Sequence, residues 1–291
     1  MPISVWDAAA IAVKTVTYAA TLGAAGAVFF LGYAGSLIAS AERLRVRNIV
    51  VGLSMLAVFA GAAQVTVSAG SMSGDAAGML DGSLIRMIWH AGAGRANAIR
   101  DIGLLLAVRG DWSDRRSWLA FLGAAMAATS FAWTGHARSL NPDLLPMLLQ
   151  SAHLLGVAFW LGALAPLHMV AGNGDLERIA ATAVRFGMVA VFVVAILMAA
   201  GIGLLGMLLG NVTELWGSAY GRYVTVKLAF VACLLSLAAF NKLRLTPRIV
   251  ANDTKAVRAL RASIRLELLL GALILAVTAT FTTLAGPPVL G

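Results

Sequence analysis

Three of the four histidines in the sequence lie at similar depths near one end of three separate apolar segments. These are His90, His136 and His153. At about 1.5 Å per helical residue, their positions extend from the end of a segment to roughly 10 Å inside it. Imidazole nitrogen is a good ligand for copper. Three imidazoles on separate helices at one end of a bundle therefore predict a metal site there.

Two methionines accompany these histidines in the sequence. Met87 precedes His90 by three residues, so the two side chains share one helix face, and Met147 precedes His153 by six. Thioether sulfur selects Cu(I), which extends the prediction to a soft site of imidazole and thioether ligands. The alternative interpretation is that the histidines bond to neighbouring helices and that methionine fills the apolar core. Residue spacing leaves both open, and it places His168 at the opposite end as an interfacial residue.

The segments that must position these side chains are long and apolar. Of the 291 residues, 60% are hydrophobic and 12% are charged, against about 25% charged residues in an ordinary soluble domain. A helix that crosses a bilayer needs about 20 mostly apolar residues, so the pattern predicts an all-α, polytopic membrane protein. Eight spans are predicted, over residues 8–39, 49–69, 84–108, 118–135, 146–170, 183–209, 223–240 and 264–284.

Basic residues are concentrated in alternate connections between the predicted spans. The net charge of +9 could suggest binding to nucleic acid, but most of the basic residues lie between apolar runs, where they orient a membrane protein. The positive-inside rule then predicts that both termini are periplasmic and that residues 1–291 form a single transmembrane domain. The connections after the first, third, fifth and seventh spans carry Arg43, Arg45, Arg47, Arg109, Arg115, Arg116, Arg178, Lys242, Arg244, Arg248, Lys255, Arg258 and Arg261.

Sequence motifs of soluble enzymes are missing or misplaced. The stretch Gly201-Ile-Gly-Leu-Leu-Gly206 fits a dinucleotide-binding pattern, but it lies inside an apolar segment with no strand before it. The sequence has no phosphate-binding loop and no His-Glu-x-x-His motif. Its single cysteine, Cys233, excludes a disulfide framework and a metal site built on cysteine pairs. We therefore expect a protein that is not an enzyme and hydrolyses no ATP.

Ionisable residues inside the apolar segments are costly, and each marks a position inside the bundle or at a functional site. Lys14, Arg95, Lys227 and Glu267 are of this kind. Lys227 lies near the outer end of its predicted span and Glu267 near the cytoplasmic end of the next, so a direct ion pair between them is not expected. Their roles are not determined by the sequence.

Several motifs in the second half of the sequence resemble those of the copper resistance protein D (CopD) family of bacterial inner-membrane proteins. The resemblance is strongest over residues 185–287 and continues into residues 134–162, whereas the first hundred residues match only in hydropathy. Lys242 departs from the family's usual arginine. The motifs are Arg185-Phe-Gly187, Tyr220-Gly-Arg222, Lys227-Leu228, Asn241-Lys-Leu-Arg-Leu-Thr-Pro247, the 263–267 stretch, Thr134-Gly-His-Ala137 and His153-Leu-Leu-Gly-Val-Ala-Phe-Trp-Leu-Gly162.

This resemblance implies copper homeostasis at the inner membrane, with import from periplasm to cytoplasm and often a periplasmic copper-binding partner, CopC. It also makes His136 and His153 candidate ligands for Cu(I) or Cu(II). Copper, membrane lipid and a CopC-like protein are thus the expected partners, and nucleic acid is not. The predicted copper ligands are His136, His153, His90, Met147 and Met87.

Two other functions remain open at this point. A membrane redox protein could hold haem b between two of His90, His136 and His153 on facing helices. Alternatively, the protein could buffer copper for a periplasmic carrier without moving it across the bilayer. A visible spectrum tests the first alternative, and copper flux into liposomes tests the second.

Overall fold

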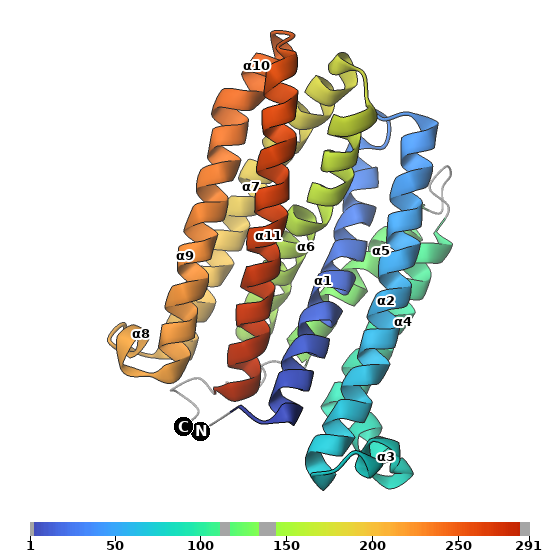
Figure 1. Ribbon diagram of the computed structural model, residues 1–291, viewed down its shortest axis with the longest axis vertical. Coiled ribbons are helices and arrows are strands. Elements are labelled where there is room, and N and C mark those ends of the chain that lie inside the picture. Colours follow the sequence, from blue (N-terminus) through green and yellow to red (C-terminus); the bar gives the residue numbers. More distant parts are fainter. Residues whose placement is uncertain (1–2, 111–116, 134–143, 286–291) are drawn as a thin grey trace.

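The computed structural model describes residues 3–110, 117–133 and 144–285. Every regular element in these ranges is a helix, so the prediction of an all-α fold is confirmed. The helices stand side by side in one bundle (Figure 1). Helix α1 starts and α11 ends at one end of the bundle, which we call the termini end, and α10 lies at the opposite end, which we call the basic end.

The N-terminal region packs around α1. This helix begins at a capping box: Ser4 Oγ accepts a hydrogen bond from the Asp7 backbone N–H at 3.0 Å, and Asp7 Oδ2 accepts one from the Ser4 N–H at 3.0 Å. Helix α1 contacts α2, α4 and α5 of its own region and α6, α7 and α11 of the other. The elements of this region are α1 (Val5–Ala34), α2 (Ser40–Ser73), η1 (Ala77–Leu80), α3 (Gly82–His90), α4 (Gly92–Arg109), α5 (Ser117–Thr129) and η2 (Ser130–Trp133).

The C-terminal region contains four long helices that stand together in Figure 1. A π-helical turn, η4, continues α9 directly into α10. Residues 256–261, which the sequence predicts as a short amphipathic basic helix at the lipid surface, lie in the first turns of α11. The elements are α6 (Leu144–Asn173), α7 (Leu176–Leu209), α8 (Glu214–Gly217), α9 (Ala219–Phe240), η4 (Asn241–Leu245), α10 (Thr246–Val250) and α11 (Thr254–Leu284).

Six helical segments in the described part of the chain are long and apolar enough to cross a membrane. They correspond to six of the eight predicted spans and support a multi-pass membrane protein. The apolar helical segment at 117–133 is shorter. The number eight and the orientation of the termini stay predictions. The six segments are Val5–Ala34, Ser40–Ser73, Leu144–Asn173, Leu176–Leu209, Ala219–Val250 and Thr254–Leu284.

The predicted span over residues 84–108 is not one continuous helix. Helix α3 ends at His90, Ala91 is extended (ψ 176°), and α4 begins at Gly92. The close turn depends on Gly94, because a Cβ at this position would lie 2.0 Å from the carbonyl oxygen of Trp89. Gly92 and Gly94 also lower the helix propensity of this segment. His90 therefore lies at the end of a short helix and not within one continuous long helix.

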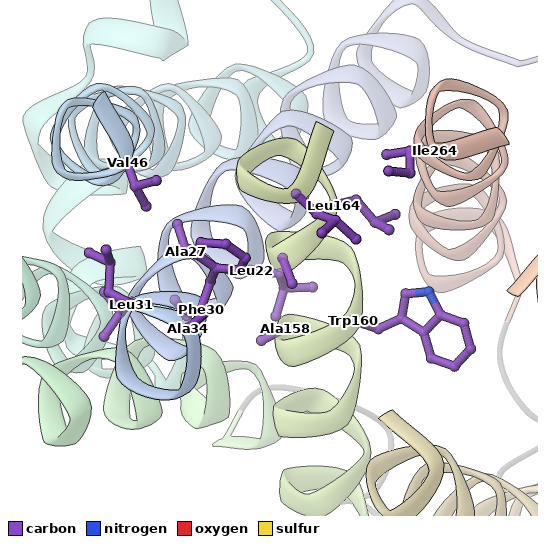
Figure 2. Close-up of a cluster of buried hydrophobic side chains, with 14 of the residues drawn as sticks. Leu22, Ala27, Phe30, Leu31, Ala34, Val46, Ala158, Trp160, Leu164 and Ile264 are labelled. Atoms are coloured by element: carbon purple, nitrogen blue, oxygen red, sulfur yellow. The ribbon is translucent and has the colours of Figure 1, made fainter. Parts of the chain in front are cut away.

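Small residues bring α1 and α6 into close contact. A Cβ on Gly26 would lie 1.8 Å from the carbonyl oxygen of Ala158, and one on Gly162 would lie 2.4 Å from the Cα of Gly26. Close backbone approach at small residues is a common way to join helices in membranes. This contact fixes the position of α6, which carries His153. Buried side chains around it, shown in Figure 2, include Leu22, Phe30, Val46, Trp160, Leu164 and Ile264.

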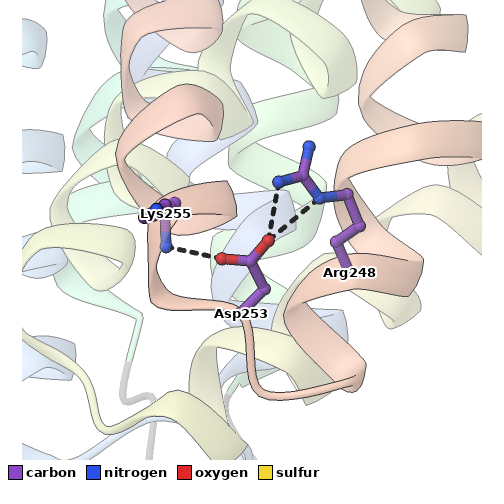
Figure 3. A network of polar contacts seen from close by, with 3 residues as sticks. All are labelled: Arg248, Asp253 and Lys255. Carbon is purple, nitrogen blue, oxygen red and sulfur yellow. Dashed lines mark hydrogen bonds and ion pairs between the residues drawn. The ribbon is translucent and has the colours of Figure 1, made fainter.

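An exposed polar network closes the turn between α10 and α11 at the basic end (Figure 3). Arg248 donates hydrogen bonds from Nη2 and Nε to Asp253 Oδ2, at 2.7 and 3.0 Å. Asp253 Oδ1 accepts a third bond from the Lys255 backbone N–H at 2.8 Å and so caps α11. The hydrogen bonds from Arg248 hold the pKa of the Asp253 carboxyl below its ordinary value.

Candidate functional site

A cavity of about 310 Å³ lies among α1, α6, α7, α9 and α11, and we call it the His153 cavity. Most of its wall is apolar, with a few polar side chains from different helices. Among the residues that line it there is no Asp or Glu. Such an apolar pocket with a few convergent polar groups is the usual form of a small-ligand site. Its polar and aromatic lining comprises Tyr18, Phe131, Gln150, His153, Trp160, Tyr220, Lys227, Thr278, Phe281 and Thr282.

The His153 imidazole faces α7 across this cavity. Its Nδ1 atom is buried, and it makes no hydrogen bond of normal geometry to any residue that the structure describes, although the ring lies near the backbone of Leu197. A Cβ on Gly201 would lie 3.4 Å from Nδ1, so glycine at this position leaves room beside the ring. A buried nitrogen without a partner is costly, and it is available to a ligand in the cavity.

Lys227 extends from α9 into the same cavity. Its Nζ atom lies 5.7 Å from the centroid of the Phe281 ring, and no carboxylate of the described residues is within ion-pair distance of it. Lys227 and His153 both line this cavity, from α9 and α6. A protonated Lys227 therefore opposes entry of a cation, because two positive charges repel strongly where water is scarce.

A second cavity, of about 300 Å³, lies closer to the basic end, and we call it the Glu267 cavity. Glu267 on α11 is 2% exposed, and its Oε1 accepts a hydrogen bond from Asn241 Nδ2 at 2.5 Å. The Oδ1 atom of Asn241 is buried without a partner among the described residues. Lys242 lines the same cavity, but its Nζ donates to the Gly187 carbonyl oxygen at 2.6 Å.

The π-helical turn η4 places Asn241 in this cavity. Thr246 Oγ1 donates to the Asn241 carbonyl oxygen at 3.0 Å, and Pro247, which has no N–H group, follows at the start of α10. Insertions of π-helical geometry within helices are frequently found at functional sites. Here the wider turn brings the Asn241 side chain to Glu267 on the neighbouring helix.

Trp160 and Leu235 line both cavities. Trp160 is 4% exposed, and Figure 2 shows its indole ring projecting from α6 toward α11. Its Nε1 atom has no hydrogen bond of normal geometry within the described ranges, although it lies near Glu267. The two cavities are thus neighbours, and these two side chains form the wall that they share.

Other buried charges in the bundle have structural partners. Lys14 Nζ donates to Thr283 Oγ1 at 3.0 Å and ties α1 to α11. Arg100 is 3% exposed; it donates to Asn97 Oδ1 at 2.8 Å and to Ser130 Oγ at 3.2 Å. Its guanidinium also lies 4.2 Å from the centroid of the Phe131 ring. These groups hold helices together and open onto neither cavity.

The predicted copper ligands occupy different parts of the molecule. His90 and Met87 are on α3, where His90 is exposed and Met87 is 50% exposed, and α3 packs against α2, α4 and η1. His153 and Met147 are on α6, with Met147 packed against the main core. His136 lies outside the described residues. Over the described ranges, no three His, Cys, Asp or Glu side chains are grouped so that they could hold a metal ion. The copper site at these five residues stays a prediction.

Sequence reasoning identified Lys227 and Glu267 as unusual, and they line different cavities, in agreement with their predicted depths. It did not identify the contact of Asn241 with Glu267 or the position of Trp160 between the cavities. The Asn241…Pro247 motif carried a signal, because a proline shortly after an asparagine in an apolar helix indicates an irregular turn. Nothing in the sequence indicates which helix that turn would face.

Two family models match the chain. The model described as Copper resistance protein D matches residues 180–281, and the one described as Copper resistance protein D-like, N-terminal domain, matches residues 5–141. The expectation that the first hundred residues match only in hydropathy is therefore wrong. No curated protein and no solved structure matches the chain. The matched ranges include α1 and α9 and nearly all of α7 and α11, while α6, with His153 and Trp160, lies between them.

Proposed function

The chain belongs to the copper resistance protein D family, and on this premise we propose that it transports copper ions across the bacterial inner membrane, from periplasm to cytoplasm. Membership of the family implies a role in copper resistance and homeostasis. Transport, its direction and the ligands that carry it are the proposal.

The observation that carries the proposal is the pair of neighbouring cavities between the long helices of the C-terminal region. The His153 cavity lies toward the termini end and the Glu267 cavity toward the basic end, and Trp160 and Leu235 separate them. A buffering protein needs one site that opens to one side of the membrane. Two sites in series, with a side-chain barrier between them, suit an ion that enters from one side and leaves to the other.

Copper is captured in the His153 cavity, with His136 as a second imidazole and with His90, Met147 and Met87 as further ligands that the ion meets on its way in. Neutral ligands suit passage, because a site must bind an ion well enough to admit it and weakly enough to release it. The membrane potential then contributes about 2.3 kcal/mol per charge per 100 mV, so this chain needs no ATP hydrolysis of its own. A CopC-like periplasmic protein supplies the ion at the termini end.

Lys227 regulates entry in this mechanism. Its ammonium and His153 line the same cavity, so a copper ion that enters meets the repulsion of this charge. A free ammonium excludes small inorganic cations that have no affinity for imidazole. A soft ion is admitted because its bond to the imidazole nitrogen compensates for the repulsion.

Replacement of the two imidazoles tests the function. We expect the double variant His136→Ala, His153→Ala to lose copper uptake into proteoliposomes that contain a copper indicator. Changes to groups that merely support a metal ligand already reduce affinity about 10–100-fold, so loss of two ligands should reduce uptake to background. The matched control is His168→Ala, on the same helix but outside the cavity lining.

The same preparation distinguishes the rival functions. Normal uptake by the double variant at normal expression contradicts the assignment of the ligands. Copper binding without flux in the unaltered protein indicates a buffering role. A strong Soret band in the purified protein indicates a haem protein. Uptake that is lost in the double variant and retained in His168→Ala is the result expected for a copper transporter.

A further inference from the structure

We propose that Glu267 and Asn241 form a proton-binding site that exchanges its proton for the copper ion as the ion passes through the Glu267 cavity. This inference rests on the proposed transport function. It assigns to the carboxylate a role that the imidazole and thioether ligands cannot have, because neutral imidazole and thioether have no proton to release at neutral pH.

The Glu267 carboxyl group is buried in the helix bundle. Glu267 is 2% exposed on α11, inside a segment long and apolar enough to cross a membrane. An ionised carboxylate is expensive in such surroundings unless a cation or several hydrogen-bond donors compensate for it. No such cation lies within ion-pair distance of Glu267 among the described residues. The carboxyl group can therefore be neutralised by a proton or by a passing cation.

Few charged groups surround the Glu267 carboxyl group. The Glu267 cavity has two ionisable residues in its lining, Glu267 itself and Lys242 of η4, and the Lys242 ammonium is bonded to the Gly187 carbonyl oxygen. Helices α6, α7 and α9 contribute Trp160 and otherwise apolar or glycine positions, α10 contributes Thr246, and α1 contributes none. On α11 itself, Arg261 and Arg265 interact electrostatically with His168, and they do not line the Glu267 cavity.

The Asn241 side chain can form a hydrogen bond with either the ionised or the protonated carboxyl group of Glu267. Its Nδ2 donates to Glu267 Oε1, which satisfies the ionised form. Asn241 is 9% exposed, and its Oδ1 atom is buried without a partner among the described residues. Rotation of the amide presents this oxygen to the O–H of a protonated carboxyl group. A residue that serves both protonation states suits a site that loads and releases protons.

The position of Glu267 gives both water and the copper ion access to its carboxyl group. The cavity of about 300 Å³ has room for water, and Glu267, Asn241, Lys242 and Thr246 in its lining supply the polar partners that a water needs, so water can carry the proton away from the carboxyl group. The Trp160 Nε1 donor lies near Glu267 without a hydrogen bond of normal geometry among the described residues, and a small movement lets it stabilise the ionised form. On the other side of this indole is the His153 cavity, from which the copper ion arrives.

The exchange step balances without a redox change. The O–H bond of the protonated Glu267 breaks, its electron pair stays on the carboxylate, and the proton passes to water in the cavity. The copper ion, unchanged in oxidation state, is then held loosely by the negative carboxylate. Carboxylate is a poor partner for a soft ion, so the ion leaves readily for the cytoplasm and the group takes up a proton again.

Proton release on copper binding tests the inference. In weakly buffered detergent solution with a pH indicator, Cu(I) held by a weak ligand should release about one proton per bound ion, as metal binding to a protonated ligand does. The variant Glu267→Gln keeps the shape of the side chain and cannot release a proton, so we expect the release to vanish. Glu42→Gln is the matched control, because Glu42 is also a buried carboxyl group but lines neither cavity.

The outcomes separate the possibilities. Release that is lost in Glu267→Gln and retained in Glu42→Gln supports the inference. Release that persists in Glu267→Gln overturns it, and loss in Glu42→Gln alone assigns the proton to Glu42 instead. Where Glu267→Gln does not fold, infrared difference spectra of the unaltered protein decide: disappearance of a protonated-carboxyl band on addition of Cu(I) supports the proposal, and an unchanged band contradicts it.

The proposed function can fail separately. If the unaltered protein binds copper but moves none into liposomes, transport is wrong, and the infrared measurement still shows whether Glu267 releases a proton. If copper flux is normal, independent of pH and equal in Glu267→Gln, transport stands and the proton site is wrong. Asn241→Leu sharpens the test, because loss of the Nδ2 donor should move the onset of proton release to higher pH.

Discussion

The N-terminal and C-terminal regions both bury ionisable side chains, but they surround them differently. In the N-terminal region, Arg100 is enclosed by Asn97, Ser130 and the Phe131 ring. Among the described residues, both regions contain buried polar atoms without a partner, but those of the N-terminal region, such as Glu42 Oε1, lie beside neither cavity. In the C-terminal region, His153 Nδ1 and Asn241 Oδ1 are such atoms beside a cavity. A satisfied buried charge stabilises a fold, whereas an unsatisfied polar atom next to open space is available to a ligand.

The close contact between α1 and α6 joins these two regions, and its disruption should have the largest effect on stability. The added methyl group in Gly26→Ala meets the Ala158 carbonyl oxygen at 1.8 Å, so the helices must separate. Overpacking of this kind costs about 1–3 kcal/mol, occasionally more. The measurement is thermal unfolding in detergent. The control is Gly52→Ala, where a Cβ would meet no atom within 4 Å, and equal unfolding temperatures for the two variants would contradict the packing argument.

Arg100 should be the clearest case of a buried charge with a structural role. Arg100→Met removes hydrogen bonds to Asn97 and Ser130 and leaves their oxygens without this donor. Loss of hydrogen bonds to a charged group should lower the free energy of unfolding by about 1.5–3 kcal/mol. Chemical unfolding in detergent measures this change. Copper flux per folded molecule should remain normal. A variant that is as stable as the unaltered protein but moves no copper would show that the role of Arg100 is functional and not structural.

Replacement of Lys227, in contrast to replacement of Arg100, should change copper binding more than stability. The variant Lys227→Met removes a positive charge that faces the His153 imidazole, so copper should bind more tightly, while the stability changes little. Removal of about 1.4 kcal/mol of repulsion corresponds to a tenfold increase in affinity. Isothermal titration with Cu(I) measures the affinity, and Lys227→Arg, which keeps the charge, is the control. Equal affinities for the Met and Arg variants would show that the ammonium does not oppose entry.

The smallest effect concerns the exposed turn between α10 and α11. Since hydrogen bonds from Arg248 lower the pKa of Asp253, the ionised carboxylate stabilises the folded state above the ordinary carboxyl pKa of about 3.9. This contribution is lost as the pH falls through the lowered pKa. Asp253→Asn keeps a capping oxygen for α11 and removes the charge. Its melting temperature should lie slightly below that of the unaltered protein at pH 7, and the difference should shrink in acid; a constant difference would contradict the linkage.

Most of the fold could be predicted because apolar run length is a local property. Six predicted spans correspond to long apolar helices, and the errors occur where short-range features interrupt the pattern. Gly92 and Gly94 divide one predicted span into α3 and α4, and the predicted surface helix merges with α11 because no helix-breaking residue separates the two. Hydropathy averages over such features and therefore does not detect them.

The sequence alone was sufficient for the membrane class, the helical architecture and the family, because composition, run length and motif identity need no knowledge of packing. Only the tertiary structure decided which polar residues meet. His153 shares a cavity with Lys227, and Glu267 meets Asn241, because the rotation of each helix about its axis and the contact of Gly26 with α6 set which faces turn inward. These rotations depend on the packing of all the helices together, and no single segment of the sequence specifies them.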